Sequence, residues 1–372
     1  MVLEQKYRPR KLSELIGQQS VVTTISNSIE LGKMHHAYLF HGQFGGGKTS
    51  CAKILAAMVN CEKGPTVDPC GKCIQCTAIF QGKHNDVLEF DAASGGKIDQ
   101  VRELRKTAFY SPVAGAKKKV YIIDECHSLT SEAEESLLRI IEEPPPHVIF
   151  VLCTTEFNKM RSTIVSRCQS HAFTKIYWTQ IVQHLQGICD KEKVSIDESA
   201  IKACAIMANG SVRDSLKYLG TLISFAGDKT ITGEMARQAL GFAGSEIYHK
   251  LMTCIIGQDG KPKPVEGYKL INQLLTSGGE FRVFIRGLDE HLRCLLIMLT
   301  APQAAEMLTL DEDDKKRIQM EATKFAIPHL DLMMTQLNEV HRCLNYGIPE
   351  ERLLDQWFMK SVCICHLSQK EK

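Results

Sequence analysis

A glycine-rich segment, Gly42-Gln43-Phe44-Gly45-Gly46-Gly47-Lys48-Thr49, constrains this chain of 372 residues more than any other feature of its sequence. It follows an apolar run, Ala37–Phe40, and precedes a helical pattern, Ser50–Met58. A strand, a loop and a helix in this order form a phosphate cradle, because the loop N–H groups and the positive end of the helix dipole face one anion. The segment therefore predicts that the chain binds a nucleoside triphosphate. The alternative is a glycine-rich turn.

Two loop residues and two acidic residues are the candidates for phosphate chemistry. Lys48 would neutralise charge on the β- and γ-phosphates, and the Thr49 hydroxyl would hold Mg²⁺. A second apolar run, Val120–Ile123, ends in Asp124-Glu125. Such a run is typical of a buried parallel strand, whose carboxyl end faces the nucleotide crevice. We expect Asp124 to hold Mg²⁺ and Glu125 to activate the attacking water as general base.

The acidic pair has two other interpretations. Asp-Glu at a strand end can be a surface turn, although the phosphate loop upstream favours the functional role. The tetrad Asp124-Glu125-Cys126-His127 also matches a DExH helicase box. A helicase is therefore the rival to be weighed against the rest of the chain.

A third apolar run, Val148–Cys153, is followed by Thr154-Thr155 and later by Ser166-Arg167-Cys168. A polar side chain at a strand end, here Thr155, can report whether a γ-phosphate is present. Arg167 is either a solvated ion-pair partner or an arginine finger, which stabilises transition-state charge in the site of a neighbouring subunit.

A length of 372 residues leaves room for two or three domains, and a hydrophobic content of 44% is ordinary for a globular protein. A net charge of +2 means that nucleic acid, if bound, must meet a local basic patch. No apolar stretch reaches membrane-spanning length and the first residues do not form a signal peptide, so we expect a cytoplasmic protein without membrane contact. A reducing compartment would leave the 15 cysteines as metal ligands or core residues.

Four of these cysteines have the spacing of a metal site. Cys61, Cys70, Cys73 and Cys76 form the pattern C-x8-C-x2-C-x2-C. Four thiolates fill a tetrahedron and leave no open position, which predicts a structural zinc site. An iron–sulfur cluster is the alternative, since four cysteines also serve it.

In their order along the chain these motifs resemble the AAA+ clamp-loader ATPases, most closely the γ/τ subunits of bacterial DNA polymerase III. Other segments fall in the order of that family, and the match is dense over the first 220 or so residues. They are Lys6-Tyr7-Arg8-Pro9 with Ile16-Gly17-Gln18, His35–Phe40, Asp91–Ser94, Glu142-Glu143-Pro144-Pro145 and Gly210–Asp214. The family also places a zinc in the insertion after the phosphate-loop helix, which favours zinc over an iron–sulfur cluster.

The resemblance implies a role for each matched residue. Thr155 is similar to the sensor of the γ-phosphate, Arg167 to the trans-acting finger, and Arg213 to the sensor arginine on the lid. From its spacing alone, Arg213 would be a surface ion-pair residue of a helix. The implied nucleotide contacts are Tyr7, Arg8, Pro9, Ile16, Gly17, Gly42, Gly45, Gly46, Gly47, Lys48, Thr49, Ser50 and Arg213.

A possible DNA contact follows Asp91–Ser94. Gly95-Gly96-Lys97 precedes a helical pattern that carries Arg102. Taken alone, Lys97 and Arg102 form a solvated basic face. In the resembled family this segment tracks the primer–template backbone, so the resemblance implies phosphate contacts from Lys97 and Arg102, independent of base sequence.

The expected architecture is an α/β AAA+ P-loop domain with a parallel sheet, followed by helices. We assign residues 1–175 to the nucleotide-binding domain with its zinc module at 61–76, residues 176–238 to a helical lid, and residues 239–372 to a helical collar. The resemblance implies an ATP-driven motor, using ATP, Mg²⁺ and Zn²⁺, in a hetero-oligomeric ring with a sliding clamp and primer–template DNA. The alternative is an AAA+ helicase or DNA-remodelling ATPase that acts without a clamp.

The chain departs from the family pattern in two places. Gly46 stands where the family more often has a bulkier residue, a change that adds flexibility but blocks no contact. The sequence also ends at the expected collar, so we expect a short γ-type product or a compact relative without the long extension that tethers polymerase.

Overall fold

The computed structural model describes residues 2–95, 98–113, 115–240, 245–257, 261–276, 281–308, 312–346 and 348–370. The chain divides into two compact units. One unit contains residues 1–190 and 208–220, and the other contains residues 191–207 and 221–372. None of the described helices is both long and apolar enough to cross a membrane.

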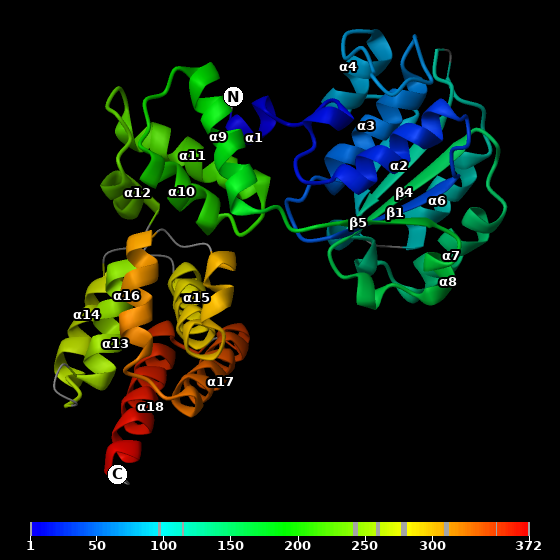
Figure 1. Ribbon diagram of the computed structural model, residues 1–372. Coiled ribbons are helices and arrows are strands. Elements are labelled where there is room, and N and C mark those ends of the chain that lie inside the picture. The colour runs from blue at the N-terminus through cyan, green and yellow to red at the C-terminus, as the bar shows by residue number, and fades with distance from the viewer. Residues whose placement is uncertain are drawn as a thin grey trace. The chain divides into compact units, whose positions relative to one another are not determined.

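A five-stranded parallel sheet forms the centre of the first unit (Figure 1). Its strand order is β2-β3-β4-β1-β5. The strands are β1 (Ala37–Gly42), β2 (Val87–Asp91), β3 (Lys119–Asp124), β4 (Val148–Thr154) and β5 (Gln169–Phe173). Because every pairing is parallel, the carboxyl ends of all five strands lie at one edge of the sheet.

Helices cover both faces of this sheet (Figure 1). One face is covered by α2 (Gln19–Glu30), α3 (Lys48–Asn60) and α4 (Ile74–Gln81). The other is covered by α6 (Ile98–Ala108), α7 (Ser131–Glu142) and α8 (Ser162–Val165). The short helices α1 (Leu3–Lys6) and α5 (Ala92–Gly95) complete this part.

Alternation along the strands explains why both faces are apolar. Tyr38 and Phe40 of β1 pack with α2 and α3, whereas Ala37 and Leu39 pack with α7 and α8. All four side chains are fully buried, as expected for successive residues that point to opposite faces of a sheet with helices on both sides. The expected α/β fold with a parallel sheet flanked by helices is confirmed.

The first unit also contains helical segments beyond the sheet. They are α9 (Trp178–Glu192), which lies in it up to residue 190, and the first nine residues of α11 (Val212–Ala226). The Ser211 Oγ accepts a hydrogen bond from the Asp214 N–H (3.2 Å), so Ser211 caps the start of α11. This cap fixes the start of α11, and the first turn of that helix contains Arg213.

The described part of the second unit is built from helices. They are α10 (Glu198–Met207), α12 (Gly233–Leu240), α13 (Ser245–Ile256), α14 (Pro264–Thr276), α15 (Phe281–Thr300), α16 (Glu312–Ala322), α17 (Ile327–Cys343) and α18 (Glu350–Lys370), with the end of α11. Helices α13 to α18 share one core, in which Trp357, Phe358 and Phe284 are fully buried. Aromatic side chains of this size contribute much of the apolar area that stabilises a helical unit.

Gly267, in this core, and Gly187, on α9 in the first unit, form a pair that separates overpacking from the general effect of removing a helical glycine. Both lie inside helices, but a Cβ on Gly267 would overlap the buried ring of Phe358, whereas nothing lies within 4 Å of a Cβ on Gly187. We expect Gly267→Ala to lower the free energy of unfolding by about 1–3 kcal/mol through overpacking. Gly187→Ala should raise it by about 0.5–1 kcal/mol, because alanine favours a helix.

Urea unfolding followed by circular dichroism would measure both changes. An unchanged unfolding midpoint for Gly267→Ala would show that the core of α14 and α18 has room for a methyl group. The Gly187→Ala chain controls for the general effect of removing a helical glycine.

Candidate functional site

The phosphate loop joins β1 to α3 and requires glycine at two of its positions. Gly45 has φ +73° and Gly47 has φ +98°, values that L-residues rarely adopt. A Cβ on Gly45 would also overlap the Ser211 hydroxyl. Gly46 has no such backbone angle, so its backbone conformation does not require glycine. The glycines at 45 and 47 therefore fix the shape of the loop.

Lys48 is the first residue of α3, and its ammonium group lies within the loop. Its Nζ donates hydrogen bonds to the carbonyl oxygens of Gly42 (2.8 Å) and Gln43 (2.9 Å). The side chain is buried, and this burial lowers the pKa of Lys48. The cation is thus held at the inner side of the loop, where a phosphate group would lie.

The two predicted magnesium ligands are in direct contact. The Thr49 Oγ1 donates to the Asp124 Oδ2 over 2.7 Å, and the other carboxylate oxygen accepts from the Glu125 N–H (3.1 Å). A hydroxyl beside a carboxylate at the mouth of a phosphate loop is an all-oxygen donor pair that suits Mg²⁺. The chemistry of these two residues therefore fits the ion.

Glu125 occupies a strained backbone position beside Thr155. Its φ of 46° and ψ of 43° lie in the left-handed region, which costs free energy for a residue with a Cβ. Its Oε2 accepts hydrogen bonds from the Thr155 Oγ1 (2.8 Å) and N–H (3.4 Å). The candidate base and the candidate γ-phosphate sensor are thus joined directly across the ends of β3 and β4.

His127 extends this arrangement, although the sequence suggested it only as the last letter of a helicase box. Its Nδ1 lies 3.0 Å from the Thr154 Oγ1 and 3.3 Å from the Glu125 Oε2. Its Nε2 lies 3.3 Å from the Glu156 Oε1. The ring therefore fixes the end of β4 relative to Glu125. Its place after Asp-Glu was the only sequence signal for this role.

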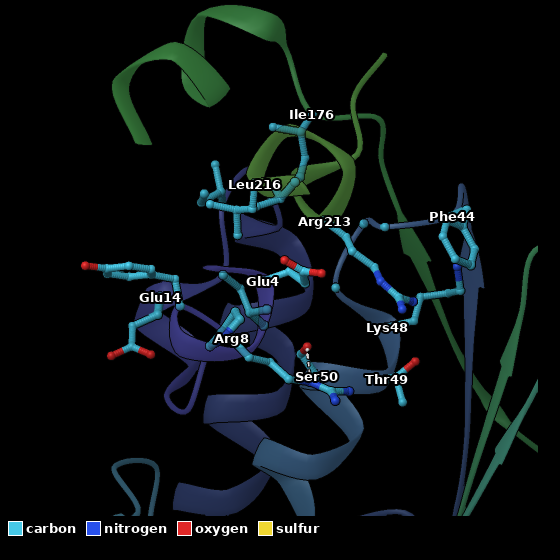
Figure 2. A pocket seen from close by; sticks show the side chains of 18 of the residues that line it. Glu4, Arg8, Glu14, Phe44, Lys48, Thr49, Ser50, Ile176, Arg213 and Leu216 are labelled. Atoms are coloured by element: carbon cyan, nitrogen blue, oxygen red, sulfur yellow. Dashed lines mark hydrogen bonds between the residues drawn. The ribbon is translucent and has the colours of Figure 1, made fainter. Parts of the chain in front are cut away.

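The phosphate loop, Asp124 and Glu125 line a cavity of about 380 Å³ (Figure 2). Most of the predicted nucleotide contacts line it too: Tyr7, Arg8, Pro9, Ile16, Gly45, Gly46, Gly47, Lys48, Thr49, Ser50 and Arg213. The Arg8 Nε donates to the Ser50 Oγ (3.2 Å), a bond drawn as a dashed line in Figure 2. Gly17, Gly42, Thr155 and Arg167 are not among the lining residues.

Arg213 extends toward the phosphate loop from the first turn of α11 (Figure 2). Its guanidinium carbon lies 5.6 Å from the centre of the Phe44 ring, within reach of a cation–π contact. Ile176 and Leu216 add apolar lining on the same side. Leu216 lies three residues after Arg213, on the same helix face, and this spacing was the only signal for it. Phe44 lies within the glycine-rich motif, at a position where the motif accepts any residue, and no sequence pattern pointed to Ile176.

Gln18 holds the loop in place from behind. Its side-chain amide donates to the carbonyl oxygens of Thr174 (2.9 Å) and Gly46 (3.4 Å), and its oxygen accepts from the Thr174 N–H (3.0 Å). Gly17, next to it, has φ +69°, and its carbonyl accepts from the Thr174 hydroxyl (3.3 Å). The segment at 16–18 therefore positions the loop as well as lining the cavity through Ile16.

Arg167 lies apart from the cavity. Its guanidinium forms an ion pair with Glu142 (2.7 Å) and donates to the Thr163 carbonyl (2.9 Å). The side chain is 38% exposed, so solvent and other molecules can reach it. The arginine is held at a surface outside its own phosphate site.

The predicted DNA contacts are described only in part. Lys97 lies outside the described residues. Arg102 lies on α6, and its side chain is exposed.

The four clustered cysteines converge near α4. The sulfur atoms of Cys61, Cys70, Cys73 and Cys76 all lie within 4.8 Å of one another, and each is a free thiol. Cys73 caps α4, where its sulfur accepts from the Cys76 N–H (3.4 Å). Hydrogen bonds from the Lys72 and Cys73 N–H groups lower the pKa of the Cys70 thiol to about 6. Four converging sulfurs of this kind fit a tetrahedral metal with thiolate ligands.

Three family models match consecutive parts of the chain. The model "DNA polymerase III, delta subunit" matches residues 17–177. The model "DNA polymerase III clamp loader subunit, ATPase lid domain" matches residues 180–227. The model "DNA polymerase III subunits gamma and tau domain III" matches residues 231–343.

Curated relatives agree with these models. The chain is 36% identical over 307 residues to the DNA polymerase III subunit tau of Bacillus subtilis, covering 81% of this chain and 52% of that one. It is 37% identical over 300 residues to the gamma subunit of Buchnera aphidicola, covering 81% of each. A solved structure of the Thermotoga maritima RuvB Holliday junction branch migration motor matches 73% of this chain and 85% of its own, with 19% identity and a TM-score of 0.48. The chain spans about half the length of the B. subtilis relative.

The contact between Thr155 and Glu125 can be tested with two substitutions. Thr155→Val removes the hydroxyl and keeps the shape, whereas Thr155→Ser keeps the hydroxyl. A hydrogen bond to a charged group contributes about 1.5–3 kcal/mol, so we expect Thr155→Val to slow ATP hydrolysis about 10- to 100-fold. Thr155→Ser should stay close to the parent rate.

Steady-state ATP turnover and nucleotide affinity would be measured for both chains. Equal rates for the valine and serine variants would mean that the Thr155 hydroxyl does not position Glu125. Loss of nucleotide affinity in the valine variant alone would instead assign the hydroxyl to binding.

The cysteine cluster gives a separate prediction. Cys73→Ser removes one of four ligands and the cap of α4, so we expect loss of bound zinc and lower thermal stability. Phosphate chemistry should change little, since no cysteine lines the cavity among the described residues. Elemental analysis and a melting curve would check both effects, and unchanged zinc content would refute the site.

Proposed function

Because the chain belongs to the gamma and tau subunit family of bacterial DNA polymerase III, we propose that it is an ATP-driven motor subunit of a clamp loader. In this role it opens a sliding clamp and loads it onto primed DNA. The observation that carries the proposal is the junction of Thr49, Asp124, Glu125 and Thr155 at the mouth of the phosphate loop. Such a junction can bind a triphosphate and hydrolyse it.

In this proposal the loop binds the β- and γ-phosphates. Backbone N–H groups of residues 45–49 and the positive end of α3 face the anion, and the Lys48 Nζ exchanges its carbonyl partners for phosphate oxygens. Mg²⁺ held by Thr49 and Asp124 would neutralise charge on the same oxygens. Tyr7, Arg8 and Ile16 form the wall for the rest of the nucleotide.

Glu125 takes the proton of the attacking water. Its Oε2 accepts a hydrogen bond from Thr155 and is approached by His127, so both side chains orient the carboxylate toward the attacking water. Because Thr155 joins Glu125 to the end of β4, a γ-phosphate that moves Thr155 would also move the base.

Arg167 serves the site of a neighbouring subunit. Its own cavity does not include it, and its ion pair with Glu142 holds the guanidinium at an accessible surface. A positive charge delivered from another subunit stabilises the transition state only when the ring is assembled. The proposal therefore includes a hetero-oligomeric ring as the active form.

Arg213 reports nucleotide state to the helical part of the chain. A phosphate bound at Lys48 would compete with the Phe44 ring for the Arg213 guanidinium, because a charge-assisted hydrogen bond exceeds a cation–π contact at an exposed site. Movement of Arg213 would carry α11 with it. We propose residues 176–238 as the lid that follows this movement and residues 239–372 as the collar that joins subunits.

The remaining parts of the proposal concern DNA, zinc and location. Lys97 and Arg102 contact the phosphate backbone of the primer–template, independent of base sequence. Cys61, Cys70, Cys73 and Cys76 hold a structural Zn²⁺ that stabilises the segment after α3. We place the chain in the cytoplasm because its relatives are subunits of a DNA polymerase.

ATP turnover of the chain, assembled with the clamp-loader partners of its host, tests this function. We expect joint stimulation by primed DNA and clamp. Lys48→Ala should abolish it through loss of nucleotide binding, and Arg167→Ala should reduce it about 10³-fold or more without loss of nucleotide affinity. Arg161→Ala is the matched control, because Arg161 is a surface arginine that also pairs with a glutamate of α7 (Glu134, 2.7 Å).

The outcomes separate the two candidate functions. Turnover that DNA alone stimulates, without any response to the clamp, would replace the clamp loader with a DNA-remodelling ATPase or helicase. Equal rates for Arg167→Ala and Arg161→Ala would remove the shared site from the mechanism.

A further inference from the structure

Three metal-ligating side chains meet inside the second unit, from helices far apart in sequence. His249 lies on α13, His291 on α15 and Glu321 on α16. Their ligand atoms all lie within 4.8 Å of one another. The His249 Nδ1 and the His291 Nε2 both lie against the same Glu321 oxygen, Oε2, the latter at 3.1 Å. We name these three residues the histidine–glutamate cluster.

The cluster is buried within an apolar core. The side chains of His291 and Glu321 are 4% and 9% exposed, and that of His249 is 17% exposed. Tyr248, whose ring stacks on His291 at 5.9 Å, and Leu292 belong to the surrounding core. A carboxylate in such surroundings is costly unless opposite charge compensates it.

Two buried polar atoms of the cluster lack a hydrogen-bond partner among the described residues. The Glu321 Oε1 and the His249 Nε2 are buried, and neither has a hydrogen-bond partner there. Both imidazoles instead approach one carboxylate oxygen and leave the other unpaired. Each contact with that oxygen requires either an N–H on the facing ring nitrogen or a cation that binds both the nitrogen and the oxygen. A single cation would serve both rings at once.

We propose that His249, His291 and Glu321 form a second metal site, which binds a divalent transition metal of the zinc class. Two imidazole nitrogens and one carboxylate are a ligand set that zinc uses in proteins. Glu321 can bind through both oxygens, which would give the Oε1 a partner. The ion would tie α13, α15 and α16 together, so its role is structural.

This site differs from the cysteine cluster in a way that spectroscopy can detect. Its ligands are nitrogen and oxygen, whereas Cys61, Cys70, Cys73 and Cys76 offer only sulfur. Cobalt bound to thiolates has strong near-ultraviolet charge-transfer bands, and cobalt bound to nitrogen and oxygen has only weak visible bands. The probe is therefore Co²⁺ in place of Zn²⁺, loaded into the full-length chain after chelation.

We expect two equivalents of metal per chain. The double variant Cys73→Ser/Cys76→Ser should keep one equivalent, with visible bands and no thiolate bands. Adding His291→Gln to it should remove that equivalent. The matched control is His341→Gln, because His341 is exposed in the same unit and contributes nothing to the cluster.

Two results would overturn the proposal. One is a parent chain with a single equivalent that His291→Gln leaves unchanged. The other is a folded double-cysteine variant that binds no cobalt. If the double-cysteine variant does not fold, His291→Gln in the parent chain decides: the proposal requires a fall from two equivalents to one, with the thiolate bands intact. None of these measurements depends on ATP turnover, so they can refute the second metal site without refuting the proposed clamp-loader function.

Discussion

Parallel pairing of β1, β3 and β4 is the constraint on which the phosphate site depends. It brings the carboxyl ends of three strands to one edge, so that Thr49 contacts Asp124 and Thr155 contacts Glu125 although these pairs are far apart in the chain. An antiparallel strand in this set would move one of these ends to the opposite edge. The apolar helices on both faces exclude the solvent that would otherwise compete for the strand hydrogen bonds. The strained backbone of Glu125 persists because this surrounding structure holds it.

Charged groups at the site are held by partners that a nucleotide or a neighbour can replace. Lys48 is bonded to carbonyl oxygens, Arg213 lies near an aromatic ring and Arg167 pairs with an exposed glutamate. The Arg167 pair would be replaced at a modest cost in free energy, since exposed ion pairs contribute about 0–1 kcal/mol. Exchange for a phosphate is therefore favourable, because charge-assisted bonds are stronger. The site responds to its ligand by exchanging partners and does not have to order free side chains.

The sequence predicted the fold and most of the cavity because the informative residues are close together in the chain or end an apolar run. Gly45, Lys48 and Asp124 are of this kind. Phe44, Ile176 and Leu216 were not predicted as apolar lining, since that role depends on how α11 packs near the phosphate loop, which local sequence does not specify. The contact between Glu125 and Thr155 could be expected from parallel strands. The pairing of Arg167 with Glu142 could not, because either residue could pair with several neighbours on the surface.

The sequence did not reveal the histidine–glutamate cluster, because its three residues are far apart in the chain and no local pattern joins them. His249 and Glu321 are 72 positions apart, whereas Cys61 and Cys76 are 15 apart. Closing the longer loop in the unfolded chain costs about 1.4 kcal/mol more, since the cost grows with the logarithm of loop length. A metal that bridges α13 and α16 would therefore hold together residues whose loop closure is more costly than that of neighbouring cysteines. The cysteine cluster lies within one segment, whereas the histidine–glutamate cluster joins three helices that also share an apolar core.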